Sequence, residues 1–231
     1  MSILECKDLS KSFGSVQALQ NVNLTIEPGR IVGLLGPNGS GKTTLIKLAN
    51  GLLTPSGGEL LIDGMAPSRQ THKIVSYLPD RTCIPTWMTT AQLLDFYSDF
   101  FKDFRRDAAV QMLVHLNINE GQKIKQMSKG TREKVQLIVV MSRASGLYLL
   151  DEPIGGVDPA TRDYILNTVI SNYNPQAAVI ISTHLIADVE KVLDDVYFIN
   201  QGRIVLQSSV DAIREEKGMS VDALFREVFK C

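Results

Sequence analysis

The chain has 231 residues, of which 44% are hydrophobic and 21% charged, enough for one large domain or two small ones. Its formal net charge of -1 gives no electrostatic reason to expect nucleic acid as a partner. The cysteines, Cys6, Cys83 and Cys231, show neither metal-ligand spacing nor a disulfide framework, which is typical of a reducing compartment. The first residues lack a targeting signal, and no apolar run approaches the roughly 18 residues that a membrane-spanning helix needs.

The first eighty residues are predicted to form strands around a single helix. Two segments alternate apolar and polar residues on either side of Gly14, which predicts strands of an antiparallel layer. A short apolar run that ends in a glycine-rich turn predicts a buried strand. The predicted strands are Ile3–Phe13, Val16–Ile26, Arg30–Leu35, Glu59–Ile62 and Ile74–Leu78, and the predicted helix is Thr43–Leu53.

The middle of the chain, roughly residues 81–144, is helical by pattern, and strands and helices alternate again after it. The predicted middle helices are Ala91–Phe101, Arg105–Leu116 and Thr131–Ala144. The predicted later elements are the strands Leu147–Leu150 and Ala177–Ser182, a hairpin of Val196–Asn200 and Arg203–Gln207, and the helices Pro159–Ser171, Leu185–Leu193 and Val210–Lys230. Strands that alternate with helices around a glycine-rich turn predict an α/β core with a parallel sheet.

A glycine-rich loop lies between the third predicted strand and the first predicted helix. It fits Gly-x-x-x-x-Gly-Lys-Thr, the Walker A or P-loop pattern, in which backbone N–H groups and a helix N-terminus surround phosphates. The lysine supplies a charge for the β- and γ-phosphates, and the threonine hydroxyl can bind Mg²⁺. We therefore expect Mg²⁺ and a nucleoside triphosphate, ATP, at the residues Gly36, Pro37, Asn38, Gly39, Ser40, Gly41, Lys42, Thr43 and Thr44.

Two acids end a later apolar strand, as in the Walker B pattern. If this strand lies beside the strand of the phosphate loop, Asp151 reaches the Mg²⁺ shell, and Glu152 polarises the attacking water. The alternative is a solvated strand end, which the upstream Walker A pattern disfavours.

Together these motifs resemble the nucleotide-binding subunit of ATP-binding cassette (ABC) transporters, over nearly the whole chain. Residues 127–131 lie where the family has its signature, Leu-Ser-Gly-Gly-Gln, but depart from it at Lys129 and Thr131. The resemblance implies that Ser128 and Gly130 cap the γ-phosphate held by a partner subunit in a head-to-tail dimer, although a serine there can also be an ordinary helix cap. Asp158 occupies the aspartate place of the D-loop, and an N-cap role there is compatible with it.

Three further positions match the family. His184 is in the H-loop place, which contacts the γ-phosphate and holds the catalytic glutamate, although a histidine at a strand end is often structural. Phe13 matches the aromatic residue that stacks on adenine, with a core aromatic as the alternative. Asp80 stands where the family usually has the Q-loop glutamine, so it is expected to bind Mg²⁺ but to transmit the nucleotide state differently.

The resemblance implies one ABC ATPase domain: an ATP-binding core of residues 1–80 and 145–208, a helical subdomain of residues 81–144, and a helical tail of residues 209–231. The expected fold is a P-loop triphosphatase core with a mixed parallel sheet, an N-terminal antiparallel β layer and an inserted α-helical subdomain. The motifs look most like bacterial exporter-type cassettes.

The expected function is ATP hydrolysis that powers a separate membrane permease, at the cytoplasmic face of the membrane. The residues after Asp80 would form the permease docking surface: Ile84, Pro85, Trp87, Met88, Leu93, Leu94, Phe96 and Tyr97. The alternative for Trp87 and Phe96 is that they fill the core of the helical subdomain. Other possible functions are a soluble ABC ATPase that remodels a macromolecular complex and a P-loop kinase.

Overall fold

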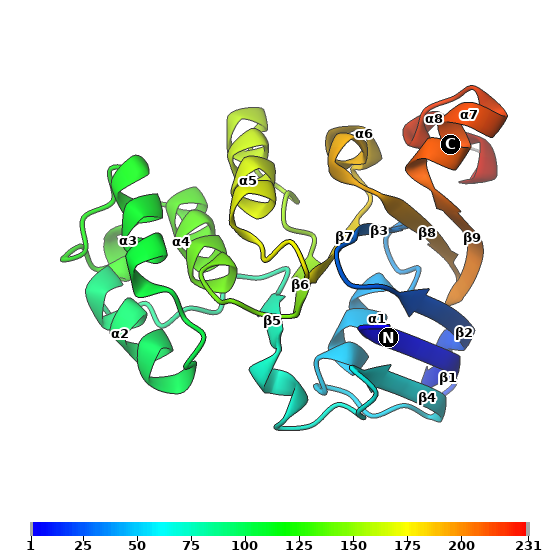
Figure 1. Ribbon diagram of the computed structural model, residues 1–231, viewed down its shortest axis with the longest axis horizontal. Helices are drawn as coiled ribbons and strands as arrows, with labels where there is room; N and C mark the ends of the chain where they lie inside the picture. The colour runs from blue at the N-terminus through cyan, green and yellow to red at the C-terminus, as the bar shows by residue number, and fades with distance from the viewer. Residues whose placement is uncertain (1, 230–231) are drawn as a thin grey trace.

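Residues 2–229, the part of the chain that the computed structural model describes, form two sheets and a separate helical region (Figure 1). The strands are β1 (Leu4–Phe13), β2 (Val16–Ile26), β3 (Ile31–Leu35), β4 (Gly57–Ile62), β5 (Val75–Leu78), β6 (Leu147–Asp151), β7 (Ala178–Thr183), β8 (Asp195–Asn200) and β9 (Arg203–Ser209). The α-helices are α1 (Lys42–Ala49), α2 (Thr90–Phe100), α3 (Arg106–His115), α4 (Lys129–Met141), α5 (Pro159–Asn172), α6 (Ile186–Val189), α7 (Val210–Lys217) and α8 (Val221–Phe229).

The smaller sheet has the order β2-β1-β4 and is antiparallel throughout, which confirms the predicted N-terminal layer. Gly14 turns the chain between β1 and β2 at a φ of 58°, a conformation that glycine adopts at low cost. Apolar side chains of this sheet pack against one face of the larger sheet and against α1. The layer therefore covers the strand and helix on either side of the phosphate loop.

The larger sheet has the order β5-β6-β7-β3-β8-β9, with parallel pairing from β5 to β8 and an antiparallel hairpin of β8 and β9. All residues of β3, β6 and β7 are buried, as expected for central parallel strands. One expectation is wrong: β6 does not pair with β3, because β7 lies between them. The carboxyl ends of these three strands nevertheless meet at one edge, where loops can build a site.

The helices α2, α3 and α4 form the region on the left of Figure 1, away from the smaller sheet, as the pattern of residues 81–144 predicts. They enclose a hydrophobic cluster of their own, which includes Leu94, Leu113 and Val135. The middle and end of α4 also pack against the larger sheet through Leu137, Val140 and Met141. Helix α4 is therefore shared between the helical region and the sheet core.

Arg143, two residues beyond α4, fastens the helical region to the larger sheet. Its buried guanidinium donates to the main-chain oxygen of Lys73, just before β5, at 2.7 Å. It also donates to the main-chain oxygen of Val75, the first residue of β5. It also pairs with Asp103 at 3.1 Å and lies 3.9 Å from the ring centre of Phe101, both in the loop between α2 and α3. Because a buried charge must be paired, this arrangement fixes the C-terminal end of α4 against β5.

Three predicted helices differ from those observed. Helix α1 ends at Ala49 rather than Leu53, because Gly51 takes a left-handed conformation. The predicted helix Leu185–Leu193 is only α6 followed by a 3-10 turn, Glu190–Val192. The predicted tail Val210–Lys230 is two helices, since Gly218 has a φ of 65° and caps α7.

Lys230 and Cys231 lie outside the described residues, and within residues 2–229 no helix is long and apolar enough to span a membrane.

Candidate functional site

The loop between β3 and α1 has the geometry of a phosphate-binding loop. Gly41 has a φ of 112°, and a Cβ atom there would lie 2.7 Å from the main-chain oxygen of Ala18. A Cβ atom at Gly36 would overlap the main-chain oxygen of Ile199. Helix α1 begins at Lys42 without a side-chain cap, so its first N–H groups face the loop. The glycines thus allow a tight turn that aims backbone donors and the positive end of a helix at one point.

Lys42 is buried, and its ammonium group lies across the mouth of the loop. The Nζ atom donates to the main-chain oxygens of Gly36 at 2.7 Å and Pro37 at 3.2 Å. It also lies 3.4 Å from Oε1 of Glu152. The lysine predicted to bind phosphate therefore already adjoins the glutamate predicted to activate water.

Asp151, the last residue of β6, faces the start of α1. Thr43 Oγ1 donates to Asp151 Oδ1 at 3.0 Å, and Ser182 Oγ donates to the same oxygen at 2.6 Å. The other oxygen, Oδ2, is buried and has no hydrogen-bond partner among the residues that the structure describes. Burial raises the pKa of Asp151, while the hydrogen bonds from Ser182 and Thr43 act in the opposite direction. An uncompensated carboxylate oxygen beside a hydroxyl group suits a hard cation such as Mg²⁺.

Ser182 is a residue of this site that the sequence prediction missed. It is the penultimate residue of β7, the strand between β6 and β3, and its hydroxyl bridges the gap that this strand order creates. Its main-chain oxygen also accepts the N–H of Glu152 at 3.0 Å. The only signal for it in the sequence was its place two residues before His184.

Glu152 and His184 form the second pair of the site. Glu152 has a φ of 49°, in the left-handed region, which turns its side chain away from that of Asp151. His184 Nδ1 lies 3.1 Å from Glu152 Oε2, within hydrogen-bonding distance when that nitrogen carries a proton. The predicted residues Lys42, Thr43, Asp151, Glu152 and His184 are therefore linked by direct contacts.

Ser128 and Asp158 each cap the N-terminus of a helix, the role predicted as an alternative for Ser128 and as compatible with the D-loop role of Asp158. Ser128 accepts the N–H of Thr131 at 3.1 Å at the start of α4, and Gly130 lies in the first turn of that helix. Asp158 accepts both the N–H and the hydroxyl of Thr161 at the start of α5, and these hydrogen bonds lower its pKa. The side chains of Ser128 and Asp158 are exposed, so both remain accessible.

Two other predicted residues form no hydrogen bond or ion pair with this cluster in the part of the chain that the structure describes. Phe13 is 47% exposed, with the Lys11 ammonium 5.1 Å from its ring centre, so the alternative of a core aromatic is wrong. Asp80 follows β5, and its half-exposed side chain lies 4.0 Å from the Arg81 guanidinium. Because β5 and β6 are parallel, Asp80 and Asp151 lie at the same edge of the sheet, and the negative charge of Asp80 contributes to the raised pKa of Asp151.

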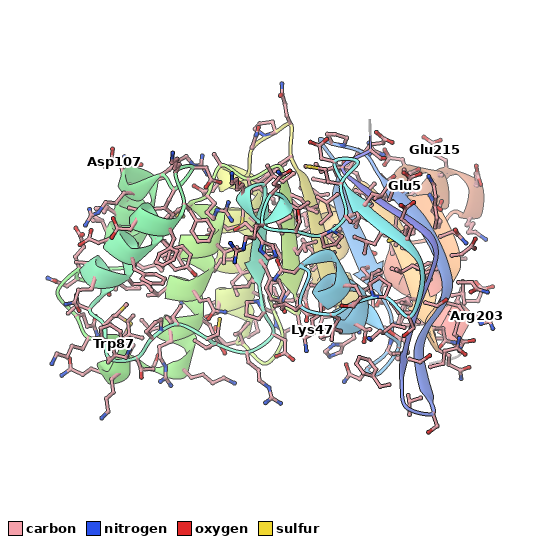
Figure 2. The ribbon with its side chains drawn as sticks, turned by 90° about the horizontal axis from the view of Figure 1, so that it is seen from below. Glu5, Lys47, Trp87, Asp107, Arg203 and Glu215 are labelled. Atoms are coloured by element: carbon pink, nitrogen blue, oxygen red, sulfur yellow. The ribbon has the colours of Figure 1, made fainter. Side chains whose placement is uncertain are left out.

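The predicted docking residues divide into two groups. Trp87 and Phe96 are 71% and 39% exposed, so the alternative that they fill the helical core is wrong; Trp87 lies at the edge of the molecule (Figure 2). Ile84, Met88, Leu93 and Leu94 are buried in that core instead, so their prediction as surface residues is wrong. A groove of about 340 Å³ opens nearby between the helical region and the sheet core, lined by residues that include Leu52, Tyr77, Tyr97, Phe101 and Arg143.

Comparisons with known proteins agree with this site. The family model described as ABC transporter matches residues 19–155, which span the phosphate loop and both acids. The chain belongs to the ABC transporter family. It is 29% identical over 217 residues to the ABC transporter ATP-binding protein YtrB of Bacillus subtilis, covering 93% of this chain and 74% of that one. It is also 29% identical to the lipopolysaccharide export system ATP-binding protein LptB of Haemophilus influenzae, covering 94% and 95%.

Among solved structures, an ATP-binding subunit of an ABC transporter superposes on the cassette with a TM-score of 0.88. The two are 26% identical, and the alignment covers 99% of this chain and 100% of the other. The protein is thus the ATP-binding, ATP-hydrolysing subunit of an ABC transporter. Membership of this family decides against the P-loop kinase, and the transporter subunits among the relatives favour transport over a soluble remodelling ATPase.

Proposed function

We propose that two cassettes bind Mg-ATP head to tail, that Glu152 takes the proton of the attacking water, and that hydrolysis drives a membrane permease. The observation that carries this proposal is the position of Glu152, whose carboxylate lies 3.1 Å from His184 and 3.4 Å from Lys42. A carboxylate between a phosphate-binding lysine and a histidine can orient a water molecule at the γ-phosphate.

Mg²⁺ fits the oxygen atoms at the end of β6. Thr43 Oγ1 and the unpartnered Oδ2 of Asp151 would hold the ion, and Asp80 would reach it directly or through water. Magnesium prefers oxygen ligands and commonly binds through one or two carboxylates together with phosphates and waters. When bound, the ion neutralises charge that develops on the phosphates.

The cassette's own residues then perform the hydrolysis. The N–H groups of the loop Gly36–Thr44 and the Lys42 ammonium hold the β- and γ-phosphates and stabilise their charge. As water attacks the γ-phosphorus atom, its proton passes to Glu152 and the bond to the bridging oxygen breaks, which releases ADP. Through Nδ1, His184 would keep the Glu152 carboxylate oriented.

The second half of each site would come from the partner cassette. Cassettes of this family dimerise and work with membrane permeases. In each cassette the exposed Ser128 hydroxyl, Gly130 and the first turn of α4 offer donors to an anion, and among residues 2–229 no hydrogen bond joins them to their own phosphate loop. The D-loop residue Asp158 would lie at the same interface. ATP therefore joins the two cassettes, and its hydrolysis separates them.

The permease would dock at the groove between the helical region and the sheet core. Tyr77, Tyr97 and Leu52 line it, and the exposed rings of Trp87 and Phe96 come from the same helical region. Aromatic residues are enriched at such interfaces. On this proposal the cassette is peripheral on the cytoplasmic face of the membrane, as in exporter-type transporters.

The concentration dependence of hydrolysis tests the dimer. Specific ATPase activity of the isolated cassette is expected to rise with protein concentration and then level off, since each site needs two chains. A colorimetric phosphate assay at saturating Mg-ATP, over about a hundredfold range of protein, measures this. A specific activity that stays constant over the whole range, with a monomer in light scattering, would contradict the proposal.

Phe13 is expected to set the affinity for the base rather than the rate of hydrolysis. Phe13→Ala should raise the KM for ATP about tenfold and leave kcat nearly unchanged, because stacking on an exposed ring contributes equally to bound substrate and transition state. Phe13→Tyr keeps the aromatic face and should behave like the wild type. Steady-state kinetics of the three proteins would decide, and an unchanged KM in Phe13→Ala would place adenine elsewhere.

A further inference from the structure

The segment between β5 and α2 carries Asp80 and is attached to the region around the signature at two places. Among residues 2–229, residues 79–84 form one hydrogen bond to another element, in which the Cys83 N–H donates to Gln136 Oε1 at 2.7 Å. Farther along, the main-chain oxygens of Thr86 and Met88 accept the N–H groups of Lys125 and Ile124, at 2.9 and 3.0 Å. The first attachment therefore joins the segment to α4 itself, and the second joins it to the residues just before Ser128.

Gln136 is a buried polar residue in the middle of α4, between Val135 and Leu137, which belong to apolar clusters. Its side chain and Asp80, Thr82, Glu133 and Glu152 line one cavity of about 30 Å³. The amide thus lies at the meeting point of the Asp80 segment, the signature helix and the loop that holds Glu152. Burial of an amide is costly unless it is hydrogen-bonded, so its use here calls for a purpose beyond packing.

The C-terminal end of α4 is fixed, whereas its N-terminal end carries the signature. Ser76 of β5 donates to the main-chain oxygen of Val140 at 2.8 Å, and Arg143 binds the start of the same strand. A helix rises about 1.5 Å per residue, so Gln136 lies about 12 Å from Ser128 along α4. Displacement of Gln136 would therefore tilt the N-terminal end of α4 about its fixed C-terminal end.

We propose that Gln136 is a positioning residue. It couples the position of the segment that carries Asp80 to the position of Ser128 and Gly130. The inference rests on the proposed function, because it assumes that Asp80 senses the bound Mg-ATP and that the signature acts on a partner cassette. Occupation of one site then sets the angle at which the same chain presents its signature to the other site. The link passes through the hydrogen bond from the Cys83 main-chain N–H to the Gln136 side chain and needs no change in the phosphate loop.

Removal of the hydrogen bond from either side tests the link. Gln136→Met keeps the size of the side chain but lacks the acceptor, and Cys83→Pro removes the donor at an exposed position. Each variant is expected to lower kcat about tenfold and to weaken the ATP-dependent dimer in a Glu152→Gln background, while the Kd for Mg-ATP at low protein concentration stays within about twofold. In the double variant the losses should not add, because both changes remove the same bond.

Two controls separate this role from a purely structural one. Cys83→Ala removes the thiol but keeps the N–H, so it should match the wild type in every measurement. Ser76→Ala removes a buried hydrogen bond at the fixed end of the same helix, so it should lower Tm by an amount similar to Gln136→Met but leave kcat within about twofold of the wild type.

The inference is overturned if Gln136→Met and Cys83→Pro dimerise and hydrolyse ATP like the wild type, or if Ser76→Ala loses as much kcat as Gln136→Met. It is also overturned if the losses in the double variant add. If Gln136→Met does not fold, Cys83→Pro decides alone against Cys83→Ala. A wild-type protein that hydrolyses ATP as a monomer would instead refute the proposed function itself, so the two failures are distinguishable.

Discussion

Replacement of Glu152 by glutamine is expected to lower kcat by roughly 10²–10⁴-fold, the range that general-base catalysis contributes. Glutamine has nearly the same shape, so it should keep the contact with His184 and the left-handed turn at this position. It cannot accept the proton of the attacking water. Binding of Mg-ATP should persist or strengthen, because Lys42 no longer has the Glu152 carboxylate, 3.4 Å away, as a competitor for the phosphates.

The same variant should accumulate as an ATP-bound dimer, since hydrolysis is the step that separates the cassettes. Size-exclusion chromatography with light scattering, in Mg-ATP and without nucleotide, measures this alongside phosphate release. Glu120→Gln is the matched control: this glutamate follows α3 in the helical region and pairs with Arg106 at 3.2 Å. Its kcat should remain within about threefold of the wild type. Turnover by Glu152→Gln at the wild-type rate would refute Glu152 as the base.

Most strands and helices could be predicted because their signals are local. Strand β2 was predicted to the residue, and β1, β3 and β5 within one residue, since buried runs and glycine turns fix them. The prediction of helix ends failed where a single backbone angle decides whether the helix continues. Gly218 divides the tail into α7 and α8 through its left-handed φ, and the sequence offered only a glycine within an otherwise helical pattern.

The residues of the site were predicted from motifs, but their arrangement was not. Strand order depends on packing between distant segments, so nothing near Asp151 showed that β7 would separate it from the phosphate loop. For the same reason Ser182, which bridges that gap to Asp151, was missed. Burial in the helical region also depends on tertiary contacts: Leu93 and Leu94 face the core while Phe96, on the same helix, faces solvent.

Asp151→Asn is expected to abolish Mg²⁺-dependent hydrolysis, with a loss of at least about 10²-fold, without destabilising the protein in the absence of nucleotide. The asparagine oxygen can still accept from Ser182 and Thr43, but the amide group that replaces Oδ2 cannot bind a cation. Burial disfavours the carboxylate at this position, so loss of its charge removes a cost of folding. The free energy of unfolding should therefore be equal to that of the wild type or about 1 kcal/mol higher.

Thermal unfolding distinguishes this role from a structural one. In the wild type, ATP with Mg²⁺ should raise Tm more than ATP with EDTA, because a ligand at about 100 times its Kd adds about 2.7 kcal/mol of stability. In Asp151→Asn the two shifts should be equal. Asp195→Asn is the control: this aspartate starts β8 at the opposite end of the sheet and pairs with Arg30 at 2.8 Å, so its loss should lower Tm but keep the Mg²⁺-dependent difference. A Mg²⁺-dependent shift that survives in Asp151→Asn would place the ion elsewhere, because the one buried carboxylate oxygen without a partner among the described residues would then not be its ligand.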